Sequence, residues 1–130
     1  MGYAIPCAVG VKTAQPDRQV VAVCGDGSFQ MSMNELAAVK AGGFDLKILL
    51  LRNGVLGLVN QIQSKPPYHG PFGVRLEGDP DIAAIAGAYG IPSMCLSDES
   101  RVEETLDRFL AEKGPCLLIA EVSPEWRTTD

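Results

Sequence analysis

The sequence predicts an α/β fold: a doubly wound parallel sheet with helices on both of its faces. Short aliphatic runs such as Val20–Cys24 and Leu46–Leu51 are typical of strands that are buried on both sides of a parallel sheet. Helical segments and turn residues alternate regularly with these runs, which is the pattern of repeated strand–helix–strand units. The 130 residues are expected to form one domain, residues 1–130.

Proline and glycine mark the element boundaries in the first half of the chain. Pro16 ends the first helix, and Pro6 lies within its first turns, where a missing backbone amide costs least. Gly42 and Gly43 end the second helix. The expected elements are a helix over Gly2–Ala14, a strand over Val20–Cys24, a helix over Met31–Ala41, a strand over Leu46–Leu51 and a short helix over Val55–Gln61.

The second half begins with a long loop over Ser64–Asp79, which is rich in proline and glycine and has no hydrophobic period. Loops of this length are often functional. Asp79 is the expected N-cap of the next helix, and Ser100 and Glu103 have the spacing of a capping box. The expected elements are a helix over Pro80–Tyr89, a strand over Ser93–Leu96, a helix from Ser100 to Gly114 and a strand over Cys116–Val122.

Composition and charge exclude several classes of function. The chain is 46% hydrophobic and 21% charged, as is usual for a globular domain. A net charge of -5 argues against a nucleic-acid partner, which requires clustered Lys and Arg. Neither a membrane-spanning apolar run nor a signal-peptide pattern is apparent. We therefore expect a cytoplasmic or organellar protein that binds neither nucleic acid nor membranes.

The four cysteines show no metal-binding or redox pattern. They are scattered without a Cys-x-x-Cys pair, and each lies in or beside an apolar run. We expect buried free thiols, with no disulfide and no zinc site. These cysteines are Cys7, Cys24, Cys95 and Cys116.

Polar motifs follow two of the expected strands. Gly25–Ser28 (Gly-Asp-Gly-Ser) follows the first, and Asn53 follows the second. Open α/β sheets bind ligands at the carboxyl ends of their strands, so these motifs are expected to meet there. Asp26 and Asn53 supply hard oxygen ligands, while Gly27 and the amide groups of the following helix suit an anion. The pattern predicts a site for a magnesium-bridged diphosphate.

These motifs and their flanks resemble the diphosphate-binding domain of thiamine diphosphate enzymes, most closely that of acetohydroxyacid (acetolactate) synthase. The resemblance implies that the cofactors are thiamine diphosphate and Mg²⁺, and that the enzyme decarboxylates and joins 2-oxo acids. It also implies a strand and helix before the segment that matches Met1, so we expect the chain to lack the first strand and helix of the fold. The matching segments are Met1–Gly10, Gly25–Leu36, Leu49–Val59 and Lys113–Glu121.

The resemblance assigns the metal ligands. The side chains of Asp26 and Asn53 and the backbone carbonyl of Val55 would bind Mg²⁺ together with two diphosphate oxygens and one water. An amide at Asn53 avoids the repulsion that a second carboxylate would meet from the diphosphate. The alternatives are a helix N-cap for Asp26 and a turn residue before Gly54 for Asn53.

Further residues are expected to contact the cofactor by the same resemblance. Met1 aligns with a methionine that packs on the aminopyrimidine ring. The Ser28 hydroxyl would bind the diphosphate or, alternatively, cap the following helix. The segment Leu56–Leu58 would line the thiazolium side or else form ordinary helix core. The expected cofactor-binding residues besides the three metal ligands are Met1, Gly25, Gly27, Ser28, Leu56, Gly57 and Leu58.

The chain departs from the family pattern at two positions. Ile62 stands where acetohydroxyacid synthases have a tryptophan in the second-substrate pocket, and Arg52 replaces an asparagine before the metal-binding amide. His69, in the long loop, is expected to be a solvated surface residue. Trp126 is expected to be a packing or interface residue.

The resemblance also implies partners. The glutamate that activates the cofactor belongs to a pyrimidine-binding domain or subunit, and no residue of this chain matches it. The other expected partners are a small 2-oxo acid and further copies of the chain in a homo-oligomer, because a missing strand leaves an unpaired edge. Two alternatives are the diphosphate-binding subunit of a split 2-oxoacid decarboxylase, of the sulfopyruvate or phosphonopyruvate type, and an isolated domain that is inactive by itself.

Overall fold

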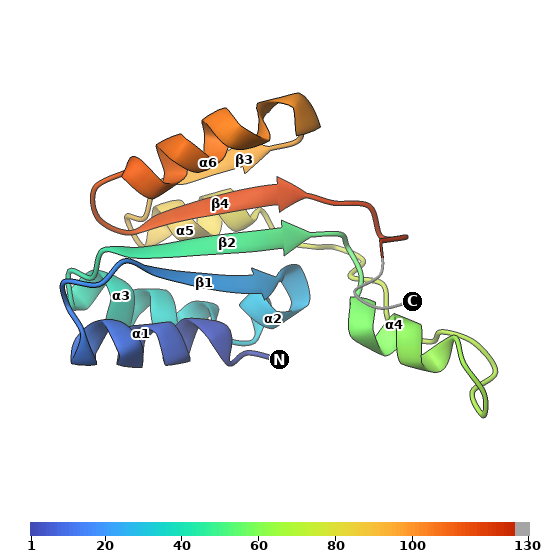
Figure 1. Cartoon of the computed structure of the whole chain (residues 1–130). Helices are drawn as coiled ribbons and strands as arrows, with labels where there is room; N and C mark the ends of the chain where they lie inside the picture. The colour runs from blue at the N-terminus through green and yellow to red at the C-terminus, as the bar shows by residue number, and fades with distance from the viewer. Residues whose placement is uncertain (127–130) are drawn as a thin grey trace.

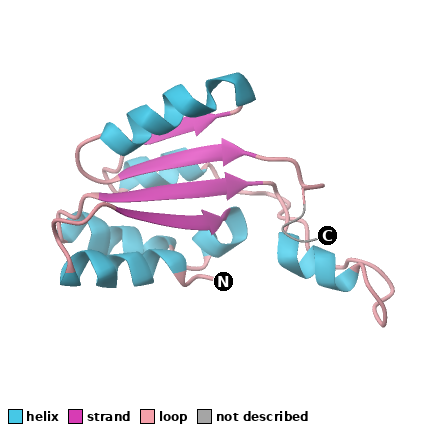
Figure 2. Cartoon of the chain, in the orientation of Figure 1, coloured by secondary structure: helices cyan, strands magenta, loops and turns pink. Residues whose placement is uncertain are grey.

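The computed structural model describes residues 1–126, which form one parallel sheet with helices on both faces (Figure 1, Figure 2). This arrangement confirms the expected α/β fold class. All neighbouring strands are parallel, in the order β1-β2-β4-β3. The strands are β1 (Val20–Gly25), β2 (Leu46–Arg52), β3 (Ser93–Leu96) and β4 (Cys116–Glu121).

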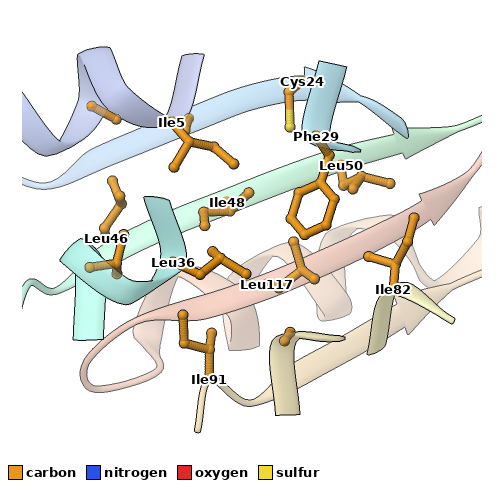
Figure 3. Close-up of a cluster of buried hydrophobic side chains, with 14 of the residues drawn as sticks. Ile5, Cys24, Phe29, Leu36, Leu46, Ile48, Leu50, Ile82, Ile91 and Leu117 are labelled. Atoms are coloured by element: carbon orange, nitrogen blue, oxygen red, sulfur yellow. The ribbon is translucent and has the colours of Figure 1, made fainter. Parts of the chain in front are cut away.

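Helices from four parts of the chain cover one face of the sheet, and one helix covers part of the other. Alternate residues of β1 and β2 point into the first layer, where Phe29, Ile48 and Leu50 are fully buried (Figure 3). Phe109 of the single opposite helix packs on Cys116 and Leu118. The first layer comprises α1 (Ala4–Ala14), α2 (Asp26–Gln30), α3 (Leu36–Ala41) and α5 (Ile82–Ala88), and the opposite helix is α6 (Val102–Ala111). The remaining helices are η1 (Met33–Glu35), α4 (Gly57–Gln63) and η2 (Glu99–Arg101).

One part of the sheet is less covered than the sequence predicts. Val21 and Val23 of β1 are 40% and 53% exposed, and Leu51 of β2 is 39% exposed. The expectation that β1 is buried on both faces is therefore wrong. Its physical reason is that α6 packs over β3 and β4, and no helix within residues 1–126 lies over β1 on that side.

Several helix boundaries differ from the sequence prediction. The helix expected over Met31–Ala41 is divided, because the chain already enters α2 at Asp26 and then passes through η1 into α3. The short helix expected from Val55 begins at Gly57, since Val55 instead forms an antiparallel bridge with Arg75. The long loop over residues 64–79 contains no helix or named strand, as expected.

The two predicted N-caps are wrong. Asp81, not Asp79, caps α5 by accepting a hydrogen bond from the Ala84 amide at 2.9 Å. Asp98, not Ser100, caps the turn that leads into α6. Asp79 is held elsewhere because its carboxylate forms an ion pair with the guanidinium of Arg52. A tertiary partner thus overrides the local preference of aspartate for a cap.

Two further features concern the burial of the cysteines and the length of the helices. All four thiols are free, with Cys24 and Cys116 buried and Cys7 partly buried. Cys95 is exposed, contrary to expectation, because it lies on β3 at the edge of the sheet. Within the described residues, no helix has the length and apolar character required to cross a membrane.

Candidate functional site

The two polar motifs lie at the carboxyl ends of adjacent strands. The first strand, β1, ends at Gly25, and α2 begins at once with Asp26. The second, β2, ends at Arg52, and a short connection leads through Asn53 to α4. Figure 1 shows α2 and α4 at the arrowhead end of the sheet, where the amino terminus also lies. This is the edge at which open parallel sheets bind ligands.

The Asp26 carboxylate joins the two motifs. Its side chain is buried, with 1% exposure. One carboxylate oxygen accepts a hydrogen bond from the Gly27 amide at 2.8 Å, and the other accepts from the Asn53 and Gly54 amides at 3.0 and 2.7 Å. Gly25, in an extended conformation, is the N-cap of α2. Asp26 is therefore not the N-cap, and it bridges the ends of two strands instead.

Asn53 forms the turn that the sequence left open as an alternative. Its side-chain oxygen accepts a hydrogen bond from the Val55 amide at 3.1 Å. Gly54 has a φ of +68°, which favours glycine because it has no Cβ. The turn leaves a ligand role possible, since an amide oxygen has two lone pairs. No hydrogen bond within the described residues ends on the Val55 carbonyl oxygen.

Ser28 brings the amino-terminal segment to the site. Its hydroxyl oxygen accepts a hydrogen bond from the Gly2 amide at 2.8 Å. The alternative in which this hydroxyl caps the following helix is therefore not observed. The contact places Met1 beside the motif, and the Met1 Cε lies 3.6 Å from the position that a Cβ on Gly27 would occupy.

Gly27 lies where another part of the chain approaches the backbone closely. A Cβ added there would lie 2.4 Å from the Cδ2 of Leu56, well inside van der Waals contact. The backbone of Leu56 is held by its amide, which donates a hydrogen bond to the Val74 carbonyl at 2.8 Å, so only its side chain is free to shift. Any side chain at position 27 would therefore displace Leu56.

A cavity of about 480 Å³ brings all of the expected site residues together. It is lined by each of the ten predicted cofactor and metal residues: Met1, Gly25, Asp26, Gly27, Ser28, Asn53, Val55, Leu56, Gly57 and Leu58. The wall also contains residues that were not predicted as site residues: Leu51, Val59, Val122, Ser123 and Trp126. The last three follow β4, which lies next to β2 in the sheet. Knowledge of the strand order would therefore have placed them beside the site.

The other singled-out residues lie away from this cavity or at its margin. His69 is exposed in the long loop, as expected. Ile62 is 49% exposed on α4 and does not line the cavity. Trp126 borders the cavity and is 61% exposed, so it is not packed in the core. Burial, and secondarily the negative charge of Asp26, raises the pKa of the neighbouring Cys24 thiol to about 11.

The donor set fits a magnesium ion that is shared with a phosphate ligand. Asp26, Asn53 and Val55 all line the same cavity, and their predicted ligand atoms are one carboxylate and two neutral oxygens. Within residues 1–126, no group of three or more His, Cys, Asp or Glu side chains could hold a metal alone. Mg²⁺ is usually bound by one or two carboxylates together with water and substrate phosphates, rather than by an all-protein cage.

A comparison with protein-family models identifies the domain. Residues 1–120 match the family described as thiamine pyrophosphate enzyme, C-terminal TPP binding domain. The chain belongs to this family. The match includes β1, β2 and the cavity residues contributed by both, so the thiamine pyrophosphate-binding domain is the part of the chain in which the two motifs meet.

Curated relatives of this thiamine pyrophosphate-binding domain are acetolactate synthases. An acetolactate synthase of Arthrospira platensis is 39% identical over 124 residues, which are 95% of this chain and 21% of the relative. The isozyme 2 large subunit of Escherichia coli is also 39% identical, over 97% of this chain and 24% of that subunit. The mitochondrial catalytic subunit of Saccharomyces cerevisiae is 34% identical over 94% of this chain and 18% of its own length. The chain thus spans about a fifth of the length of these relatives.

Proposed function

We propose that this thiamine pyrophosphate-binding domain holds the diphosphate of thiamine diphosphate through Mg²⁺, as part of an acetolactate synthase-like enzyme. The observation that supports the proposal best is the position of Asp26. Its carboxylate is buried, yet it borders a cavity and is tied to the Asn53–Val55 segment by two backbone hydrogen bonds. The three proposed metal ligands are therefore fixed relative to one another before any ion arrives.

The proposed metal ligands combine one negative charge with two neutral oxygen atoms. Among the described residues that line the cavity, Asp26 is the only one with an ionisable side chain. One carboxylate and a diphosphate together offset the charge of Mg²⁺, and a second carboxylate would repel the diphosphate. The amide of Asn53 and the carbonyl of Val55 complete the coordination without adding charge. Gly27 adds no side chain of its own to this part of the cavity.

Within residues 1–126, the side chains that line the cavity include no group suited to take the proton that the cofactor has to lose. When bound, thiamine diphosphate acts as the electron sink for decarboxylation of a 2-oxo acid. In the part of the chain that the structure describes, the cavity lining offers no second acid that could serve as an acid–base partner. We therefore propose that a pyrimidine-binding domain or subunit supplies the activating glutamate.

The surface beside the cavity suits such a partner. Met1, Leu58 and Trp126 line the cavity and are 63%, 66% and 61% exposed. Exposed apolar side chains that gather around one opening are typical of protein interaction sites. We propose that the partner domain covers them and encloses the cofactor, with a small 2-oxo acid as the substrate of the complete site.

Two alternative functions were considered from the sequence, and the comparisons with known proteins bear on the first of them. The relatives named above are acetolactate synthases, and they give no support to a split 2-oxoacid decarboxylase of the sulfopyruvate or phosphonopyruvate type. The other alternative is that the chain is an isolated domain that is inactive by itself. To distinguish it from the main proposal, a purified pyrimidine-binding domain from an acetolactate synthase is added to the chain. Pyruvate consumption should appear only in the mixture that also contains Mg²⁺ and thiamine diphosphate.

The experiment that tests the site is isothermal titration of the chain with thiamine diphosphate. We expect binding in Mg²⁺ that is lost in EDTA and abolished in Asp26→Ala and Asn53→Ala. The matched controls are Asp17→Ala and Asn34→Ala, which change the same residue types at exposed positions. Equal binding by all five proteins, or binding that ignores Mg²⁺, would refute the assignment. Circular dichroism establishes that each variant is folded.

A further inference from the structure

Four segments of the chain meet next to the site, through side chains that do not line the cavity. The Asp79 carboxylate accepts a hydrogen bond from the Gln30 side chain at 3.0 Å and from the Nε of Arg52 at 2.8 Å. A second nitrogen of Arg52 contacts Glu121 at 3.2 Å. We call Gln30, Arg52 and Asp79 the Asp79 clamp. It connects the end of α2, the end of β2 and the end of the long loop, while Glu121 attaches it to β4.

The clamp is adjacent to both halves of the proposed metal site. Gln30 is the last residue of α2, whose first residue is Asp26, and Arg52 directly precedes Asn53. The backbone carbonyl of Arg52 also accepts a hydrogen bond from the Val122 amide at 2.9 Å. The clamp thus reaches both the helix that begins with Asp26 and the residue that precedes Asn53.

The clamp also fixes the loop segment that pairs with the metal-binding turn. The Leu56 amide donates to the Val74 carbonyl at 2.8 Å, and the Leu76 amide donates to the Gly54 carbonyl at 2.9 Å. These two bonds flank the bridge between Val55 and Arg75. Because Asp79 follows this segment by only three residues, its attachment to Arg52 limits how far residues 74–76 can move from residues 54–56.

The environment of the clamp makes it stronger than an ordinary surface ion pair. The Asp79 side chain is 11% exposed and that of Arg52 is 37% exposed. Hydrogen bonds from Arg52 and Gln30 raise the cost of breaking any single contact, because the carboxylate is partly shielded from water. The exposed Arg101–Glu104 pair, with side chains 55% and 59% exposed, provides a contrast, since such pairs contribute little.

We propose that Arg52 is a positioning residue for the cofactor site, and that it acts through Asp79. By holding the loop end and α2 together, it keeps the Asn53–Val55 turn in the geometry that presents the Asn53 side chain and the Val55 carbonyl to the cavity. The proposal rests on the proposed function for its cofactor role. It explains why an arginine can stand before the metal-binding amide in this chain: its guanidinium contacts both Asp79 and Glu121, and Asp79 in turn binds Gln30 of α2.

A double-mutant cycle tests the proposal with two readouts. Arg52→Gln and Asp79→Asn should each weaken binding of thiamine diphosphate with Mg²⁺ about tenfold, and the double variant should be no weaker than either single variant. Arg52→Lys, which keeps the charge, should recover part of the affinity. In the cofactor-free chain, the amide hydrogens of Leu56 and Leu76 should exchange faster in both single variants. Arg101→Gln is the matched control and should leave both readouts unchanged.

The possible outcomes separate this proposal from the proposed function. Unchanged exchange at Leu56 and Leu76 overturns the clamp, whatever the affinity. Faster exchange with unchanged affinity overturns the positioning role and leaves only a structural contact. Losses of affinity that add up in the double variant show that Arg52 does not act through Asp79. Failure of the wild type and the Arg101→Gln control to bind thiamine diphosphate overturns the proposed function together with the cofactor role.

Discussion

Two buried charges lie at opposite ends of the same sheet. Asp26 follows β1 at the carboxyl ends of the strands, and Lys47 is the second residue of β2 at their amino ends. Each is 1% exposed. The Lys47 ammonium group donates to the Asp45 carboxylate and to the carbonyls of Glu112 and Gly114, both at 2.7 Å. The Asp26 carboxylate accepts from three backbone amides.

The difference between these two sites lies in what they face. The partners of Lys47 enclose it and fix the end of α6 to the sheet, so the charge is part of the structure. Asp26 is equally well paired, but it also borders the 480 Å³ cavity. A buried and satisfied charge is therefore weak evidence for a functional site. A buried charge at a cavity on the ligand-binding edge of the sheet is much stronger evidence.

The largest expected effect is on stability, at the amino-terminal end. Lys47→Met keeps the side-chain length but leaves two carbonyl groups without their donor. We expect the free energy of unfolding to fall by about 3 kcal/mol, as when one partner of a buried pair is removed. Urea unfolding measures this loss. Affinity for thiamine diphosphate should stay within about twofold in the folded variant, and a larger change would break the distinction between the two ends.

The matching change at the carboxyl-terminal end is Asp26→Asn, which should act mainly on binding. It removes the charge while keeping one acceptor oxygen for the surrounding amides. We expect affinity for thiamine diphosphate with Mg²⁺ to fall by about 100-fold or more, since even residues that only support a metal ligand are worth 10- to 100-fold. Stability should fall by about 1 to 2 kcal/mol. Titration calorimetry and urea unfolding on the same samples separate the two effects.

A smaller effect is expected at Gly27, where the site is closely packed. In Gly27→Ala the new methyl group would meet Leu56 at 2.4 Å and displace its side chain. Stability should change by no more than about 1 kcal/mol, because Ala favours a helix and Leu56 can move. Affinity should fall by about tenfold, or 1.4 kcal/mol. Gly10→Ala, in α1 with open space around it, is the control.

The smallest effect is a pH dependence that reports on the surroundings of Asp26. Burial and the Asp26 carboxylate raise the pKa of Cys24 from 9.0 to about 11. Well below pH 9 the thiol is protonated in both the folded and the unfolded chain, so its contribution to stability is constant. Between pH 9 and 11 the unfolded chain loses the proton first, and stability falls by about 1 kcal/mol at pH 10. The unfolding free energy of Cys24→Ala should lack this decrease, and identical slopes in both proteins would argue against it.

The sequence was sufficient to predict which residues meet at one cavity, because local signals and topology coincide there. The motifs at Gly25–Ser28 and Asn53 each follow an aliphatic strand, and parallel pairing brings strand ends together whatever the details of the helices. Contacts between residues far apart along the chain could not be predicted from the sequence. Lys47 lies within an aliphatic run, and its partners Glu112 and Gly114 come more than sixty residues later.

The wrong predictions have the same origin. Asp79 was expected to cap a helix, which is the local preference of aspartate, but Arg52 binds it from another segment. Val21 and Val23 were expected to be buried because their strand is aliphatic throughout, yet the described helices leave that side of β1 open. Val122, Ser123 and Trp126 were not assigned to the site because the position of β4 beside β2 follows from the strand order and not from any motif.

The most direct test of the account is paramagnetic NMR of the chain with thiamine diphosphate and Mn²⁺ in place of Mg²⁺. Mn²⁺ prefers the same oxygen ligands and broadens the signals of nearby nuclei. We predict that the amide signals of Gly25–Ser28 and Asn53–Val55 disappear first, while those around Lys47 and Glu112 persist at the same Mn²⁺ concentration. Broadening that begins at surface carboxylates such as Glu103 and Glu104, with Asp26 and Asn53 unaffected, would contradict the proposed site.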